Sequence, residues 1–139
     1  MDDYENIVMS YLAAQGFFLS PQYSILSDGH EWNCADFVGL DFSNKEINII
    51  EVSGAYNLSG LVKKVNNREW ITKLKTQLKQ KNIADSLDKS WRYVIRVFIR
   101  KDREAYFKEN VDNKDGSVKI EILENIPYPW SENYYRKFR

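Results

Sequence analysis

Two apolar segments, residues 33–42 and 46–53, lie on either side of a polar turn, Ser43-Asn44-Lys45-Glu46. Both segments contain residues that favour strands, and the short turn between them predicts an antiparallel hairpin. A hairpin of this kind is stable only when further strands or helices cover its apolar side chains. The chain is therefore expected to fold around a β-sheet.

The remaining periodicities place helices and further strands around this hairpin. In chain order, the expected elements are a helix over 2–15, strands over 22–26, 33–42 and 46–53, a helix over 58–81, a strand over 91–100, a helix over 102–110 and a strand over 117–125. The order αβββαβαβ predicts an α/β fold with a mixed central β-sheet flanked by helices. With 139 residues, we expect a single domain over residues 1–139.

The long helix over 58–81 has a candidate break at Asn66-Asn67. Asn67 is suited to cap the second half, with Glu69 in the first turn. Helical spacing then predicts four buried side chains in that half, namely Trp70, Ile71, Leu74 and Leu78.

The composition excludes several classes of site. With one cysteine, Cys34, and one histidine, His30, the chain cannot form an intramolecular disulfide or a zinc site built from cysteines or several histidines. The N-terminal residues are acidic and lack the apolar core of a signal peptide, and no apolar run approaches the ~18 residues of a membrane span. We therefore expect a cytoplasmic protein without a membrane partner.

Charge is distributed unevenly along the chain, although the net charge is zero. Residues 1–56 contain nine acidic residues and one base, whereas residues 57–101 contain twelve bases and three acidic residues. An acidic patch beside a basic element is typical of a metal-dependent enzyme that acts on a polyanion. The alternative is a dipolar but otherwise ordinary surface.

The hairpin carries two acidic side chains, Asp36 and Glu51, within its apolar strands. With Asn44 and Lys45 at the tip of the turn, opposed residue numbers add up to 89, so that Asp36 faces Ser53. Asp36 and Glu51 then share a face as diagonal neighbours, about 7–8 Å apart, and can converge on one divalent ion. Alternatively, Asp36 pairs with a basic side chain such as Lys63 or Lys64, and Glu51 lies at a hydrated sheet edge.

The order of these features resembles the PD-(D/E)xK nuclease superfamily, which has the restriction-endonuclease-like fold. The matching features, within residues 1–100, are Glu5 on the first helix, Asp36 on one hairpin strand and Glu51-Val52-Ser53 on the next. The resemblance implies that Asp36, Glu51 and the main-chain carbonyl of Val52 hold Mg²⁺ or Mn²⁺. It also implies that the ion activates a water for attack on a phosphodiester, and that Glu5 positions a second ion or a water.

The sequence departs from the family motif at two positions. Ala35 stands where the motif has proline, and Ser53 stands where it has the lysine that stabilises the attacking water and the phosphate charge. Some members carry this lysine on the following helix, so the resemblance implies that Lys63 or Lys64 supplies the charge. If neither reaches the site, the domain is a degenerate nuclease that binds without cutting.

The expected helix after the hairpin is strongly basic and is our candidate nucleic-acid interface. Its candidate contacts are Arg68, Lys73, Lys75, Gln77 and Lys79, with Gln77 implied by the family resemblance. A solvated outer helix face is the alternative.

These observations favour metal-dependent cleavage of nucleic acid, with DNA favoured over RNA. The main alternative is a catalytically degenerate module on the same fold that binds nucleic acid or a protein partner. An unrelated α+β domain with incidental hairpin acids is a third interpretation. The sequence leaves open whether the chain forms a homodimer.

Overall fold

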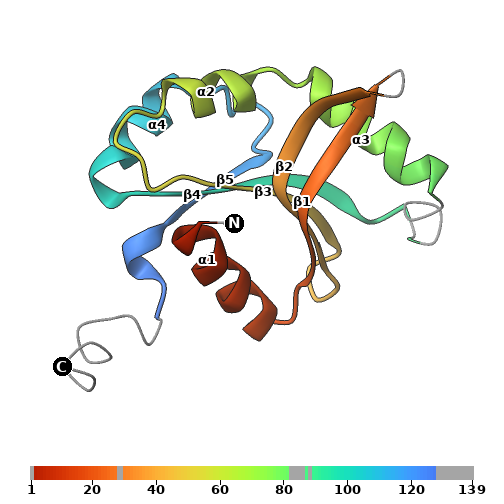
Figure 1. Cartoon of the computed structure of the whole chain (residues 1–139), viewed down its shortest axis with the longest axis horizontal. Coiled ribbons are helices and arrows are strands. Elements are labelled where there is room, and N and C mark those ends of the chain that lie inside the picture. Colours follow the sequence, from red (N-terminus) through yellow and green to blue (C-terminus); the bar gives the residue numbers. More distant parts are fainter. Residues whose placement is uncertain (1, 28–29, 82–86, 88, 128–139) are drawn as a thin grey trace.

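Five strands form one mixed sheet in the computed structural model, which describes residues 2–27, 30–81, 87 and 89–127 (Figure 1). In spatial order they are β1 (Phe18–Ser27), β2 (His30–Asp41), β3 (Glu46–Val52), β4 (Arg92–Ile99) and β5 (Val118–Ile122). The first three strands are antiparallel neighbours, whereas β3, β4 and β5 run parallel. The expected α/β domain with a mixed central sheet is confirmed.

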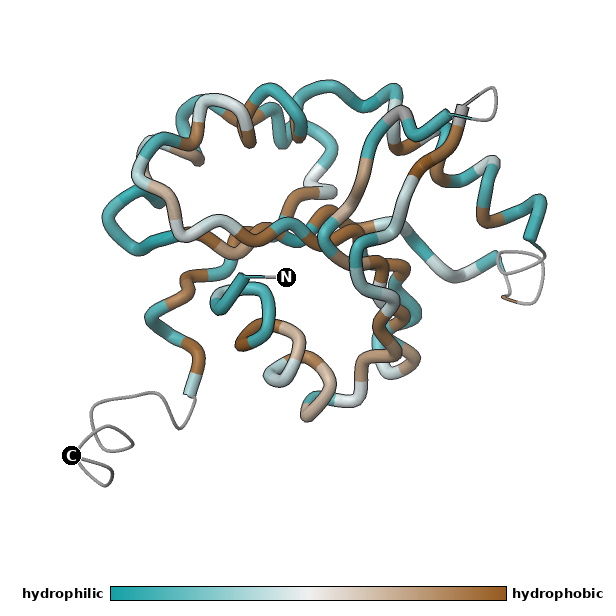
Figure 2. The backbone as a smooth tube through the Cα atoms, viewed as in Figure 1, coloured by the Kyte–Doolittle hydropathy of each residue, from teal (hydrophilic) through white to brown (hydrophobic). Residues whose placement is uncertain are grey.

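Helices cover both faces of this sheet. Helix α1 (Asp3–Ala14) packs on one face, and α2 (Ser59–Asn66), α3 (Glu69–Gln80) and α4 (Glu104–Asn110) lie on the other (Figure 1). Every residue of β3 is buried as a result. Hydrophobic residues concentrate along the central strands, and hydrophilic ones on the outer sides of the helices (Figure 2). Among the helices of the described part of the chain, none is both long and apolar enough to cross a bilayer.

The expected helix over 58–81 is two helices, α2 and α3, because the chain turns at Asn67. The expected cap is one residue out of place: Arg68 occupies the N-cap position of α3 without a side-chain cap, and Asn67 is the C-cap residue of α2. The Asn67 side-chain oxygen still accepts the backbone N–H of Glu69 at 3.2 Å. The predicted stripe is confirmed, since Trp70, Ile71, Leu74 and Leu78 are all buried against the sheet. The break turns α3 so that it packs against β1 rather than continuing along α2.

Strand β1 is longer than the 22–26 segment that the sequence predicts. It begins at Phe18 and continues through Pro21 and Gln22, two residues that disfavour strands. Pro21 is tolerated because β1 is an edge strand, where a missing backbone donor costs little. Gln22 adopts a positive φ of 47°, and the ladder between β1 and β2 skips it.

The β2–β3 hairpin has a different register from the expected one. Asp41 pairs with Glu46 across a four-residue turn, so opposed residue numbers add up to 87 rather than 89. The Asp41 carboxylate accepts the backbone N–H groups of Ser43 and Asn44, at 3.1 and 3.3 Å, and Lys45 closes the turn with a φ of 53°. These contacts within the turn stabilise a loop over residues 42–45, one residue earlier in the chain than the expected turn, and the strand pattern did not reveal this shift.

The first turn of α1 is held against the carboxyl end of β3. Asp2 and Glu5 form a capping box, in which each side chain accepts the backbone N–H of the other residue. A Cβ atom at Gly54 would overlap the ring of Tyr4, so glycine allows this close approach. This contact brings the Glu5 side chain to the end of the sheet where Asp36 lies.

Candidate active site

Asp36 and Glu51 face each other across β2 and β3. The paired ladder ends at Phe37 and Ile50, and carrying its register one step further sets Asp36 opposite Glu51. They are therefore direct neighbours and not the expected diagonal pair. A slip of two residues by itself keeps every side chain on its face. The β1–β2 ladder skips Asp36, however, and its neighbours Ala35 and Phe37 belong to the two different core clusters, so the shared face of the two acids stays a prediction.

Strand β2 separates from β3 at this point, and a side chain replaces the backbone ladder. The carboxylate of Asp36 accepts the backbone N–H of Val52 at 2.8 Å. The N–H and C=O groups of one strand residue point to the same side, so the Val52 carbonyl also faces the side of Asp36. Two carboxylates and one carbonyl oxygen thus converge where the strands divide.

Lys64 of α2 completes this group of residues. Glu51 is 3% exposed, and its Oε1 atom forms an ion pair with the Lys64 ammonium. The ammonium also donates to the Cys34 carbonyl at 2.6 Å, and the Lys64 carbonyl accepts the indole N–H of Trp70 at 2.7 Å. Apart from the ion pair, Glu51 Oε1 has no hydrogen-bond partner among the described residues. We call Asp36, Glu51, Val52 and Lys64 the carboxylate site.

The carboxylate site disfavours a second negative charge. Burial and the nearby charge of Glu51 raise the pKa of Asp36 to about 6, although the Val52 N–H acts in the opposite direction. Burial and the proximity of Asp36 also raise the pKa of Glu5. A bound cation would offset this excess of acidic groups.

We expect Asp36→Asn to raise the free energy of unfolding by about 1–2 kcal/mol near pH 8 when no divalent ion is present. The amide keeps an oxygen for the Val52 N–H and removes a disfavoured charge. The full equivalent of the pKa shift is about 3 kcal/mol, but Asp36 is only partly buried and solvent screens part of it. Urea unfolding measures the difference.

The same variant has a defined pH dependence. The folded protein holds a proton on Asp36 more tightly than the unfolded chain does, because the folded pKa is raised. The advantage of asparagine should therefore be full above about pH 6 and should shrink as the pH falls to about 4. A difference that is the same at both ends of this range would contradict the assignment.

Ser53 and Lys63 are neighbours in sequence of the carboxylate site, but within the described residues no contact joins either side chain to Asp36 or Glu51. The Ser53 hydroxyl oxygen accepts the backbone N–H of Ala55 at 3.3 Å. Lys63 is exposed, and within the described residues its side chain forms no ion pair or hydrogen bond. Of the two candidate lysines on α2, the structure therefore brings Lys64 to the acids and leaves Lys63 in solvent.

The oxygen atoms of the carboxylate site fit a hard divalent cation. Asp36, Glu51 and the Val52 carbonyl are ligand types that Mg²⁺ and Mn²⁺ accept, and Mg²⁺ usually keeps several waters. Within residues 2–27, 30–81, 87 and 89–127, no group of three acidic, cysteine or histidine side chains forms a ready ion cage. The Val52 carbonyl and water would therefore complete the shell around an ion held by Asp36 and Glu51.

Two of the candidate nucleic-acid contacts, Arg68 and Gln77, hold neighbouring segments in place through hydrogen bonds, and the Lys75 ammonium lies 4.6 Å from the ring centroid of Tyr93. Arg68 donates to Ser117 at 2.8 Å and to the Asp112 carbonyl at 2.6 Å, which fastens the loop before β5. Gln77 is buried, and its amide bonds the backbone of Ser24 and Leu26 in β1. The other three candidates lie on the outer part of α3; Lys73 is half-buried, and Lys75 and Lys79 are exposed.

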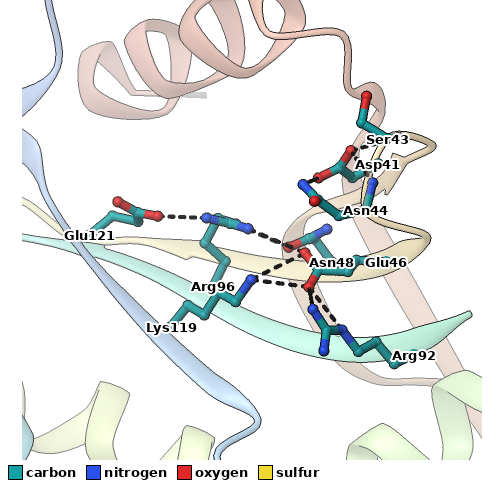
Figure 3. A network of polar contacts seen from close by, with 9 residues as sticks. All are labelled: Asp41, Ser43, Asn44, Glu46, Asn48, Arg92, Arg96, Lys119 and Glu121. Carbon is teal, nitrogen blue, oxygen red and sulfur yellow. Dashed lines mark hydrogen bonds and ion pairs between the residues drawn. The ribbon is translucent and has the colours of Figure 1, made fainter.

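A second polar cluster, which the sequence did not predict, lies on the α1 face of the sheet (Figure 3). The buried carboxylate of Glu46 accepts Arg92 at 2.7 Å and Lys119 at 3.0 Å, and Arg96 lies 3.6 Å away. Arg96 also donates to Asn48 at 3.0 Å and to Glu121 at 2.5 Å. Glu46 and Arg92 belong to opposite charge halves of the sequence, so part of the charge asymmetry is neutralised inside the fold.

A further group of candidate functional residues, which the sequence did not predict, lies in the segments that follow β3 and β4. The guanidinium of Arg103 lies 4.2 Å from the ring centroid of Tyr56 and 4.4 Å from that of Tyr106. The cluster Arg100-Lys101-Asp102-Arg103 directly after a strong strand pattern was the available signal. Because β3 and β4 are parallel, the residues that follow β4 lie at the same end of the sheet as the residues that follow β3.

Comparison with protein-family models, curated proteins and solved structures finds no match to this chain. The chemistry that the carboxyl end of β3 could support is therefore inferred from the side chains and backbone atoms found there. This end of the sheet offers oxygen ligands for a divalent cation, a lysine ammonium beside them and an arginine, Arg103, stacked on two tyrosines near the end of the neighbouring strand.

Proposed function

We propose that this chain is a metal-dependent phosphodiesterase that cleaves nucleic acid, with DNA favoured, on a fold of the PD-(D/E)xK type. The observation that carries the proposal is the contact between Lys64 and Glu51. A lysine at the acidic pair is what the resemblance requires, and the motif position itself holds Ser53. The order of α1, β1, β2, β3, the α2–α3 pair and β4 also agrees with the αβββαβ core.

The residues of the site have distinct roles in this proposal. Asp36, Glu51 and the Val52 carbonyl would hold Mg²⁺ or Mn²⁺, which polarises a phosphate and lowers the pKa of water when bound. Lys64 has three N–H donors, of which Glu51 and the Cys34 carbonyl occupy two. The third donor is left for a water or a phosphate oxygen, where it would stabilise developing negative charge.

A cleavage assay with the full chain tests the proposal. We expect Mg²⁺ or Mn²⁺ to support cutting of plasmid DNA, labelled single-stranded DNA or RNA, and a chelator to stop it. Asp36→Asn and Glu51→Gln should each abolish cutting, because each removes a charged ligand while preserving side-chain shape. Circular dichroism would check that both variants fold. Wild-type protein that cuts none of these substrates with either ion contradicts the enzymatic proposal.

A module that binds nucleic acid without cutting is the second candidate. The observation in its favour is that Lys64 already balances the charge of Glu51, so this part of the site is neutral without an ion. Such a module should bind without cutting, and Ser53→Lys should then produce some cleavage, because the carboxylates are already opposed. Calorimetry with Mn²⁺ adds a separate readout, since Asp36→Asn should abolish ion binding if the site is a metal site.

Both candidate functions predict that nucleic-acid binding weakens as the salt concentration rises. We expect the double variant Lys75→Ala and Lys79→Ala to flatten the slope of log affinity against log salt by about 1–2 units, because both side chains are exposed on α3. Fluorescence anisotropy with labelled DNA measures the slope. The variant Lys108→Ala is the control, since Lys108 pairs with Glu104 on α4. An unchanged slope in the double variant would place α3 outside the interface.

A further inference from the structure

We propose that Arg103, stacked between Tyr56 and Tyr106, is a contact for a nucleic-acid phosphate that flanks the one at the carboxylate site. The inference rests on the proposed function and names a substrate contact outside the acidic pair. We call Tyr56, Arg103 and Tyr106 the arginine stack.

The arginine stack lies at the same edge of the sheet as the carboxylate site. Glu51 pairs with Val97 in the parallel ladder, and the Ser53 N–H still bonds the Phe98 carbonyl at 2.9 Å. The chain leaves β3 toward Tyr56 and leaves β4 toward Arg103 from this common edge. Tyr56 follows Glu51 by five residues, so their Cα atoms are at most about 18 Å apart, a distance that a few nucleotides span.

Helix α4, which carries Tyr106, is also tied to the helix that carries Lys64. The Asn66 side chain at the end of α2 donates to the Asn110 carbonyl at 3.0 Å and accepts the Asp112 N–H at 2.7 Å. The two helices lie next to each other above the sheet (Figure 1). The arginine stack and the carboxylate site are therefore both anchored to this pair of helices.

The donors of Arg103 are unused, which distinguishes it from its neighbours. Arg100 forms two hydrogen bonds with Asp102, at 2.7 and 3.0 Å, so its charge is balanced locally. Arg103 forms no ion pair or side-chain hydrogen bond within the described part of the chain, and its Nε is buried without a partner. The two tyrosine rings thus fix the plane of a guanidinium that still lacks an anion.

A phosphate is the anion that fits this arrangement. A planar, oriented guanidinium binds phosphate oxygens through two parallel N–H donors, and less of its freedom is lost on binding when aromatic rings already hold it. Tyr56 is 61% exposed, so the stack is open to a large ligand. A phosphate bound here would lie beside the carboxylate site rather than in it, and would align the backbone with the acidic pair.

Binding measurements on the full chain test this inference separately from cleavage. We expect Arg103→Met to weaken binding of a labelled DNA about 5–10-fold at moderate salt and to flatten the log-affinity against log-salt slope by about 1. Arg103→Lys should also bind less tightly than wild type, because lysine keeps the charge but not the planar fork. Lys108→Met removes a cation of the same helix that is already paired with Glu104, and should leave the slope unchanged.

The outcomes separate the two proposals. If wild-type protein binds and cuts DNA but Arg103→Met has the wild-type affinity and slope, the phosphate contact is wrong and the proposed function stands. If Arg103→Met changes the slope but wild-type protein shows no metal-dependent cutting, the phosphate contact is supported and the chain is a module that binds without cutting. Wild-type protein that binds neither DNA nor RNA overturns both. Thermal melting of each variant excludes loss of binding through unfolding. Tyr56→Leu provides a second variant that keeps both arginines but removes the ring that lies 4.2 Å from Arg103 and 5.7 Å from Arg100, and it should weaken binding less than Arg103→Met.

Discussion

Replacing Lys64 with methionine is expected to lower metal-dependent cleavage by about 10²–10³-fold, the usual cost of one preorganised charged contact in a transition state. Lys64 alone of the two adjacent lysines contacts Glu51. Lys63→Met is the matched control, because it removes an identical charge one residue away from an exposed side chain, and it should retain nearly full activity. Single-turnover cleavage of a labelled DNA, with enzyme in saturating excess, compares the cleavage rates of the two variants independently of their affinity for DNA.

A loss of folding must be separated from a loss of catalysis in this test. Lys64→Met leaves the Glu51 carboxylate buried without its ion-pair partner, which typically costs about 3–5 kcal/mol. The double variant Lys64→Met and Glu51→Gln should regain most of this stability, since no unpaired charge remains, but should stay inactive. Equal cleavage by wild type, Lys64→Met and Lys63→Met would contradict the proposed role of Lys64.

Glu46→Gln is expected to lower the free energy of unfolding by about 2–3 kcal/mol, because it removes a buried anion that accepts charge-assisted hydrogen bonds from several cations. Glu46 is fully buried, and Arg92, Arg96 and Lys119 all converge on it (Figure 3). The Arg96 side chain is only 11% exposed and would retain Glu121 as its sole acidic partner. Urea unfolding followed by circular dichroism measures the loss.

Glu121→Gln is the control for the Glu46 variant. Glu121 contacts the same Arg96 side chain but is 38% exposed, so its removal should cost about 1 kcal/mol or less. A cost for Glu46→Gln no greater than that for Glu121→Gln would mean that the network does not behave as a buried one. Glu46 begins β3 and Glu51 lies near its other end, so DNA binding by folded protein should be unaffected.

The elements of the fold were largely predictable because their signals are local. Helical spacing in α3 identified Trp70, Ile71, Leu74 and Leu78 as buried, and the β-branched run in β4 identified the strand. The pair of acidic residues in the hairpin, Asp36 and Glu51, was likewise visible from the sequence, and the structure brings the two together where β2 and β3 separate. None of these inferences needs the position of any distant residue.

The register of the hairpin could not be obtained in the same way. Alternation has a period of two, so registers that differ by two residues bury the same side chains and have the same pattern. The choice between them depends on the turn, where Asp41 accepts two backbone N–H groups and Lys45 adopts a positive φ. This difference makes Asp36 and Glu51 direct neighbours rather than diagonal ones.

By itself, the sequence determined most of the elements, the helical stripe that packs on the sheet and the presence of two acidic residues in the hairpin. The tertiary structure decided which lysine meets those acids, because adjacent residues on a helix point in directions about 100° apart and only the packing of α2 selects Lys64. It also decided that Arg68 and Gln77, two of the candidate nucleic-acid contacts, make structural hydrogen bonds, and it placed Arg103 between two tyrosines. Most of these pairings join residues that are distant in the sequence, and their energies depend on burial, which no local pattern contains.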